Sequence, residues 1–308
     1  MSAVLEAAAW ALAPRVAALP LRSARECELL EGLSRAQKAV SADWLFDARG
    51  RELHATWTRS DAHYAARSEV ALMRRAAPVL ARAAAGEVGV LELGHGHGRA
   101  TELLLAAVDA AAFHAVDPRV ADVNDAALLQ GAALALAATR QPVVYFPGAG
   151  IGRFSPQAAM ALLGQLGKSF GRGTLMLVAA DATQEPKRLL PAYDDRAGLA
   201  AAFNKHLLAR WNRELDAGFE ASAFAHQARW NAAQHAIELH LVARVAHVVP
   251  LLGERIAFAA GESIHTLTCR KHTLLMFRAL TRHAGWAHRE FWMDSSSAYA
   301  LHLLEYLG

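Results

Sequence analysis

The 308-residue sequence has only two cysteines, Cys27 and Cys269, and lacks any apolar run of membrane-helix length. Two cysteines do not make a disulfide framework, so the pattern favours a reducing compartment. A membrane-spanning helix needs about 18 or more consecutive apolar residues. Glu6 and Arg15 interrupt the apolar N-terminus, which therefore resembles a helix rather than a secretory signal. We expect a cytoplasmic protein with no membrane partner.

Blocks of like charge are also missing. The chain has 32 Lys and Arg against 29 Asp and Glu, interspersed along its length, and a formal net charge of +3. Nucleic-acid-binding domains concentrate Lys and Arg on one face or in one run, so we expect no nucleic-acid partner. Hydrophobic residues make up 54% of the chain, which is enough for a globular protein of two domains.

The middle of the chain alternates short apolar strands with helices. The strands are predicted at 88–94, 112–118, 142–148 and 173–181. Such alternation is typical of an α/β domain with a mostly parallel sheet. Only one helix separates Asp117 from the strand at 142–148, so we expect a doubly wound, Rossmann-like sheet that is one strand short. Asp122, Asn124 and Asp125 are the nearby candidates for contacts that the absent strand would supply.

The alternation of short strands and helices ends after Asp181. A long helix at 199–219 precedes a stretch of alternating apolar and polar residues, 236–262, which predicts an antiparallel meander or hairpin. We therefore expect a second, α+β domain. The predicted division is 69–181 plus 272–308 for the first domain and 1–68 plus 182–271 for the second.

A glycine-rich loop follows the first predicted strand, in the order Glu92-Leu-Gly94-His-Gly96-His-Gly98. Its glycines allow the backbone to approach a ligand, and the following helix offers unpaired N–H groups. Dinucleotide loops carry a further glycine where this chain has Arg99, whereas an acid two residues before the first glycine suits S-adenosylmethionine. A tight turn without a ligand is the alternative. The predicted cofactor contacts are Glu92, Gly94, His95, Gly96, Gly98, Asp117 and Gly148, with Asp117 accepting hydrogen bonds from ribose hydroxyls.

His95 and His97 also raise the possibility of a metal site. Two histidines on one loop are a weak signal without a third ligand at a known spacing, and the chain has 15 scattered histidines. We therefore predict no metal.

Longer motifs resemble the histidine-specific, S-adenosylmethionine-dependent methyltransferase family. The resembling segments, in the family's order, are 45–69, 90–98, 146–154, 192–219, 236–241 and 259–266. The resemblance implies a methyltransferase domain and a second domain that holds an amino-acid substrate. It further implies an N-methylated amine or amino acid as product.

The resemblance also implies substrate contacts, several of which are altered here. Tyr64 and Tyr193 match the family, whereas Phe46 and His63 replace tyrosines and Arg153 replaces an asparagine. Leu267 and Cys269 stand where the family has the Glu and Ser that grip the imidazole. Because Leu267 does not imitate a carboxylate, histidine is not the expected substrate.

Two roles in this pocket follow from side-chain chemistry. The planar fork of Arg153 suits a carboxylate, either on the substrate or on an internal acid such as Asp194 or Asp195. Tyr193 or His63 is expected to receive the proton of the amine. The expected substrate is a small amine, amino acid or heteroaromatic nitrogen compound, although a catalytically silent binding protein with the same fold is the alternative.

Overall fold

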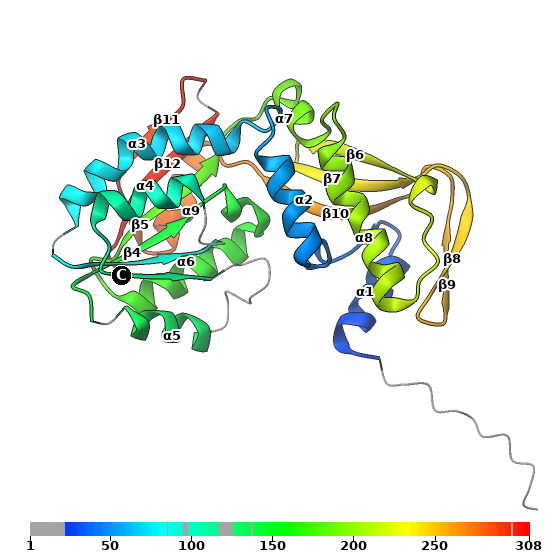
Figure 1. Ribbon diagram of the computed structural model, residues 1–308, viewed down its shortest axis with the longest axis horizontal. Coiled ribbons are helices and arrows are strands. Elements are labelled where there is room, and N and C mark those ends of the chain that lie inside the picture. The colour runs from blue at the N-terminus through cyan, green and yellow to red at the C-terminus, as the bar shows by residue number, and fades with distance from the viewer. Residues whose placement is uncertain (1–21, 85, 95–97, 117–125, 137, 297) are drawn as a thin grey trace, which may run out of the picture.

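The computed structural model describes residues 22–84, 86–94, 98–116, 126–136, 138–296 and 298–308. Figure 1 shows two lobes, one built on a six-stranded sheet and the other on a four-stranded sheet. No helix within these ranges is long and apolar enough to cross a membrane.

The six-stranded sheet confirms the predicted Rossmann-like α/β class. Its strands are β2 (Val88–Glu92), β3 (Ala112–Ala115), β4 (Gln141–Phe146), β5 (Leu175–Asp181), β11 (Trp286–Met293) and β12 (Tyr299–Tyr306), in the spatial order β11-β12-β5-β4-β2-β3. The pairs from β3 to β5 are parallel, whereas β12 runs antiparallel to both β5 and β11. The chain order reverses between β2 and β4, which is where open α/β sheets bind ligands.

Helices cover both faces of this sheet. One face packs against α3 (Ala65–Ala83) and α4 (Arg99–Val108). The other packs against α5 (Ala126–Ala135), α6 (Pro156–Phe170) and α9 (Leu274–His283). Residues of its own sequence begin helix α6, because the Ser155 hydroxyl accepts a hydrogen bond from the Ala158 amide and Pro156 occupies the first turn.

Strand β3 forms an edge of the sheet. Within the described ranges no strand pairs with its outer side, and α5 alone leads from this region to β4. Phe113 in β3 is 40% exposed, which fits an uncovered edge. The sheet is thus one strand short in the described part of the chain, as expected.

The second lobe contains the sheet β1-β10-β7-β6 and a separate hairpin, β8–β9. The strands are β1 (Lys38–Ala39), β6 (Phe224–Asn231), β7 (Ala236–Ala243), β8 (His247–Leu251), β9 (Glu254–Phe258) and β10 (Ser263–Arg270). The helical segments on this side are α1 (Ala24–Ser34), η1 (Ala42–Leu45), α2 (Ala48–Thr58), α7 (Pro186–Tyr193), α8 (Leu199–Leu215) and η3 (Ala221–Ala223).

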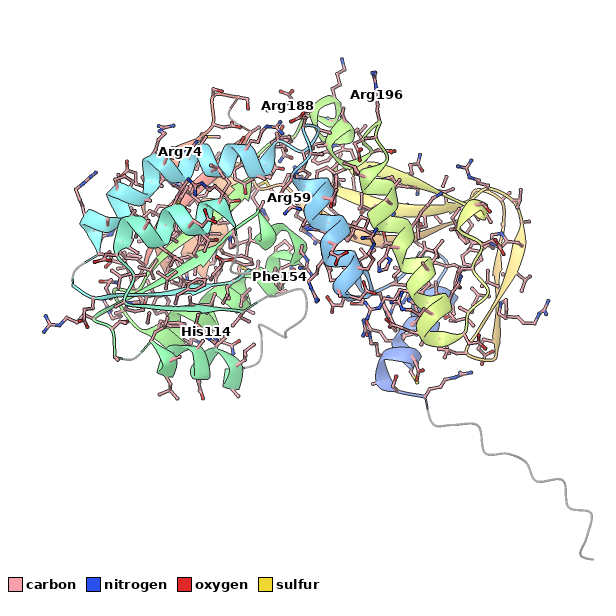
Figure 2. The ribbon with its side chains drawn as sticks, in the orientation of Figure 1. Arg59, Arg74, His114, Phe154, Arg188 and Arg196 are labelled. Atoms are coloured by element: carbon pink, nitrogen blue, oxygen red, sulfur yellow. The ribbon has the colours of Figure 1, made fainter. Side chains whose placement is uncertain are left out.

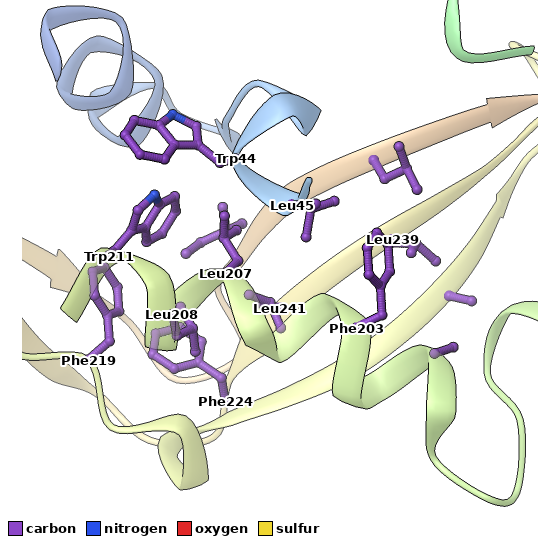
Figure 3. Packing of buried hydrophobic residues seen from close by; sticks show 14 of the residues in the cluster. Trp44, Leu45, Phe203, Leu207, Leu208, Trp211, Phe219, Phe224, Leu239 and Leu241 are labelled. Carbon is purple, nitrogen blue, oxygen red and sulfur yellow. The ribbon is translucent and has the colours of Figure 1, made fainter. Parts of the chain in front are cut away.

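Helix α8 fills the core of the second lobe. Figure 3 shows Phe203, Leu207 and Trp211 of α8 beside Leu239 and Leu241 of β7, with all of these side chains fully buried. This core also takes in residues from α1 to Tyr64, so the N-terminal segment and the segment after α7 pack as one unit. The division into two domains at the stated boundaries stays a prediction.

Helix α2 is an element that the sequence did not indicate, since residues 41–67 show little periodicity. Its N-cap is Asp47, whose carboxylate accepts a 2.7 Å hydrogen bond from the Gly50 amide. The same carboxylate contacts His206 at 2.6 Å and Arg213 at 2.7 Å, both on α8. Helix α2 is therefore held in place mainly by tertiary contacts with α8.

Candidate active site

The candidate site lies at the carboxyl ends of the parallel strands. Glu92 is the last residue of β2 and Asp181 the last residue of β5, so both lie at the same edge of the sheet. The loop after β4 contains the short helix η2 (Gly150–Arg153), which contacts β10 of the second lobe. Figure 2 places Phe154, the residue after η2, where the two lobes meet.

Glu92 is buried at the start of the glycine loop. Its Oε2 accepts a 2.6 Å hydrogen bond from the Thr101 hydroxyl of α4. A Cβ on Gly94 would lie 2.4 Å from Glu92 Oε1, so the position needs glycine. Gly98 is the N-cap of α4 and, having no side chain, leaves the first amides of the helix uncapped. The predicted contacts His95, Gly96 and Asp117 lie outside the described residues, as do Asp122, Asn124 and Asp125.

The loop after β4 is held by Glu69, an α3 residue that the sequence analysis did not select. Its carboxylate accepts hydrogen bonds from the Gly148 amide at 2.9 Å, the Tyr145 hydroxyl at 2.7 Å and the Tyr299 hydroxyl at 3.0 Å. Burial raises the pKa of the Glu69 carboxyl, although these donors act in the opposite direction. Gly148 has a φ of +69°, which favours glycine, and its amide is engaged by Glu69.

A buried ion pair stands beside this loop. Lys271, the residue after β10, donates a 2.7 Å hydrogen bond to Asp181 Oδ2, and the Tyr64 hydroxyl donates to the same oxygen at 2.6 Å. Burial opposes the charge of Lys271, but Asp181, Tyr64 and Cys269 together act in the opposite direction, and the pKa of the ammonium is raised. Neither Asp181 nor Lys271 was selected from sequence.

The Lys271 ammonium also donates a 2.8 Å hydrogen bond to the hydroxyl of Tyr193, the last residue of α7. Burial raises the pKa of Tyr193 well above its usual value. A phenol that already accepts from a cation and resists ionisation is suited to donating a hydrogen bond. This geometry runs against the expectation that Tyr193 receives the proton of the amine.

His63 lies between aromatic rings, with centroids 5.2 Å from Trp57 and 5.7 Å from Tyr193. Burial, with Lys271 as a further contributor, lowers the pKa of His63 to about 4, so its ring is neutral near pH 7. No described residue forms a hydrogen bond with its Nδ1. An imidazole of this kind accepts a hydrogen bond but does not retain a proton near neutral pH.

Arg153 ends η2 and points toward the second lobe. Its guanidinium lies 4.8 Å from the centroid of the Phe46 ring and 3.6 Å from Asp43 Oδ1. The sequence analysis named Asp194 and Asp195 as internal acids that could pair with Arg153, but the structure pairs neither of them with it. Asp195 instead caps α8 through the amides of residues 199 and 200, and Asp194 lies 3.9 Å from His226.

Leu267 and Cys269 lie on β10 and pack against the core of the second lobe. Leu267 is buried, and Cys269 is partly buried beside the Tyr193 hydroxyl. Burial raises the pKa of the Cys269 thiol, while the positive charges of Lys271 and Arg153 act in the opposite direction. The structure thus brings together seven predicted residues: Phe46, His63, Tyr64, Arg153, Tyr193, Leu267 and Cys269.

Sequence reasoning missed Glu69, Asp181 and Lys271. A signal existed for Asp181, because an acid that ends an apolar strand of a parallel sheet lies at the ligand-binding edge. Glu69 and Lys271 carry no such local signal. Among the residues that the structure describes, no group of three or more His, Cys, Asp or Glu side chains is arranged to hold a metal ion.

Comparisons with known proteins show the family of this chain. The family described as histidine-specific, S-adenosylmethionine-dependent methyltransferase matches residues 25–133 and 118–306. The histidine N-alpha-methyltransferase of Mycolicibacterium smegmatis is 33% identical over 95% of this chain and 98% of its own length. That of Mycobacterium tuberculosis is 29% identical over 90% and 93%, and the N-methyltransferase imqF of Aspergillus flavus is 24% identical over 88% and 82%.

The fold and these matches define an S-adenosylmethionine-dependent methyltransferase. The chain belongs to the histidine-specific methyltransferase family and is an enzyme. The residues present fit the cofactor, because a buried carboxylate, Glu92, ends β2 and the first amides of α4 follow Gly98, which has no side chain to cap them.

Proposed function

We propose that this enzyme N-methylates a small amine that bears a carboxylate and an apolar side group in place of imidazole. The observation that carries the proposal is the face of β10 that bears Leu267 and Cys269, two residues apart, with Cys269 beside the Tyr193 hydroxyl and near the cation of Arg153. Apolar side chains do not satisfy the ring N–H donor and the second ring nitrogen of histidine, which would be left without partners on desolvation. The guanidinium and the Tyr193 hydroxyl are donors that suit a carboxylate.

Each part of the chain then has a role. When bound, S-adenosylmethionine supplies an electrophilic methyl group on a sulfonium. Glu92 and the first turn of α4 are proposed to hold this cofactor, and Glu69 keeps the adjoining loop in place through the Gly148 amide. Neutral His63 accepts a hydrogen bond from the amine and thereby orients its lone pair, which favours reaction by positioning.

The test is methyl transfer to a panel of free L-amino acids, with radiolabelled cofactor and mass spectrometry of the products. We expect apolar amino acids such as leucine, methionine or phenylalanine to be methylated, and histidine to react more slowly by a factor of about 10⁴. Efficient formation of the trimethylated betaine from histidine would contradict the proposal.

A converse variant strengthens this test. Leu267→Glu combined with Cys269→Ser restores the family's two imidazole partners, so histidine methylation is expected to increase. Because Leu267 is buried, thermal unfolding with S-adenosylhomocysteine must first show that the variant is folded. Cys269→Ser alone is the matched control, since it restores no carboxylate.

A further inference from the structure

The inference concerns the ion pair between Lys271 and Asp181, which lies at the junction of the two lobes. The side chains are 2% and 3% exposed, and the Nζ–Oδ2 distance is 2.7 Å. The backbone is joined at the same point, because the His272 amide donates a 2.7 Å hydrogen bond to the Asp181 carbonyl. A buried ion pair is commonly no more stabilising than packed apolar side chains, so stability alone does not account for it.

The direction of each hydrogen bond in the cluster is fixed by chemistry. An ammonium has three donors and no acceptor, so the Tyr193 oxygen must accept the 2.8 Å hydrogen bond from Lys271. Asp181 accepts from Lys271 and from the Tyr64 hydroxyl on Oδ2, and from the Thr183 amide on Oδ1 at 3.2 Å. Tyr64 is thereby committed to Asp181.

Tyr193 is left with its own proton to donate. The Cys269 thiol is a hydrogen-bond partner of this hydroxyl, and the positive charge of Arg153 also acts on that thiol. A thiol sulfur is only a weak acceptor, so the substrate can replace it. A hydrogen bond accepted from a cation strengthens the hydrogen bond that the same hydroxyl donates. The acceptor that suits such a phenol beside a guanidinium is an anion.

We propose that Lys271 is a positioning residue of the substrate site, which, with its charge balanced by Asp181, fixes the Tyr193 hydroxyl as a donor to the substrate's carboxylate. This role rests on the proposed function, because it requires a substrate with a carboxylate. Lys271 acts through Tyr193, so it sets how well the enzyme distinguishes an amino acid from the corresponding amine.

The test compares the binding of matched probes by calorimetry in saturating S-adenosylhomocysteine. The probes are L-leucine with isopentylamine, and L-phenylalanine with phenethylamine, which differ only in the carboxylate. The double variant Lys271→Met with Asp181→Asn removes both charges and leaves no unpaired ion. The control is Lys38→Met with Glu262→Gln, which removes another ion pair of the second lobe, 2.5 Å long and with side chains 11% and 25% exposed.

We expect the wild type to bind the amino acid more tightly than the amine, and this ratio to fall about tenfold or more in the Lys271/Asp181 variant. The ratio stays unchanged in the control, because general loosening weakens both probes alike. Adding the double substitution to Tyr193→Phe causes no further fall, since Lys271 acts through that hydroxyl.

Three results would overturn the inference: no preference for the amino acid in the wild type, an unchanged ratio in the Lys271/Asp181 variant, or an equal fall in the control. The methyl-transfer panel reports separately on the proposed function. Methylation of amino acids together with an unchanged ratio would refute the role of Lys271 alone. Absence of transfer to every amino acid would refute the proposed function.

Discussion

At the scale of single residues, Arg153 is the most informative departure from the family pattern. A permanent cation stands where the family has a neutral asparagine, and it lies over the Phe46 ring and 3.6 Å from Asp43 Oδ1. Asp43 is itself largely exposed, so water weakens that ion pair. The planar donor fork of a guanidinium matches a carboxylate bidentately, and we propose this contact for Arg153 with the carboxylate of the substrate.

We predict that Arg153→Ala raises KM for the best acceptor of the amino-acid panel about tenfold or more, since a charge-assisted contact is lost. Affinity for S-adenosylhomocysteine should remain within about threefold, because Glu92 and the first turn of α4, which are proposed to hold the cofactor, lie on another segment. Steady-state kinetics and calorimetry measure the two effects. Arg196→Ala, at the exposed position that Figure 2 shows on the rim of the molecule, is the control. A parallel loss of cofactor affinity would mean that Arg153 shapes the whole site.

At the scale of elements, helix α6 shows how two glycines of one helix differ. A Cβ on Gly167 would lie 2.2 Å from the ring of Tyr306 in β12, and that ring is held against Trp286 with centroids 5.2 Å apart. A Cβ on Gly164, less than one turn earlier, would meet nothing within 4 Å. Gly167 therefore allows the helix to pack closely on the sheet, whereas Gly164 has no such packing role.

Gly167→Ala is therefore expected to lower the free energy of unfolding by about 1–3 kcal/mol through overpacking. Gly164→Ala, its matched control, should raise it by about 0.5–1 kcal/mol, because alanine favours the helix and nothing is displaced. Urea unfolding measures both. Equal effects of the two substitutions would show that the Tyr306 ring moves aside without cost.

At the scale of the whole molecule, buried histidines link stability to pH. Burial lowers the pKa of His63 and His272 to about 4 and that of His302 to about 3. In the unfolded chain these groups titrate near 6.5. As the pH falls below about 6.5, the unfolded state takes up protons that the folded state does not, so the folded state loses stability.

We predict that the free energy of unfolding falls steadily between about pH 6.5 and pH 5, by up to about 1.4 kcal/mol per pH unit for each such histidine. Urea unfolding at several pH values measures the slope. His302→Leu, which keeps an apolar contact with Phe277, should reduce it by one histidine's share. A flat profile over this range would contradict neutral burial of these rings.

The sequence by itself determined those features that depend on residues close together along the chain. Alternating apolar segments specified the parallel sheet, and Ser155 with Pro156 specified the start of α6. The motif resemblance also located seven side chains that the fold brings together. Helix α2 and strand β12 were not indicated, because residues 41–67 show little periodicity and Tyr299–Tyr306 is an almost continuous apolar run without alternation.

Only the tertiary structure decided the partners of the buried charges. Glu69 reaches the Gly148 amide across 79 positions, and Lys271 reaches Asp181 across 90. No local pattern records such a pairing, because it depends on which strand ends and loops the completed sheet brings to one edge. Burial and the neighbouring charges then set the pKa of His63, Tyr193 and Lys271, since both are properties of the folded chain rather than of the residue type.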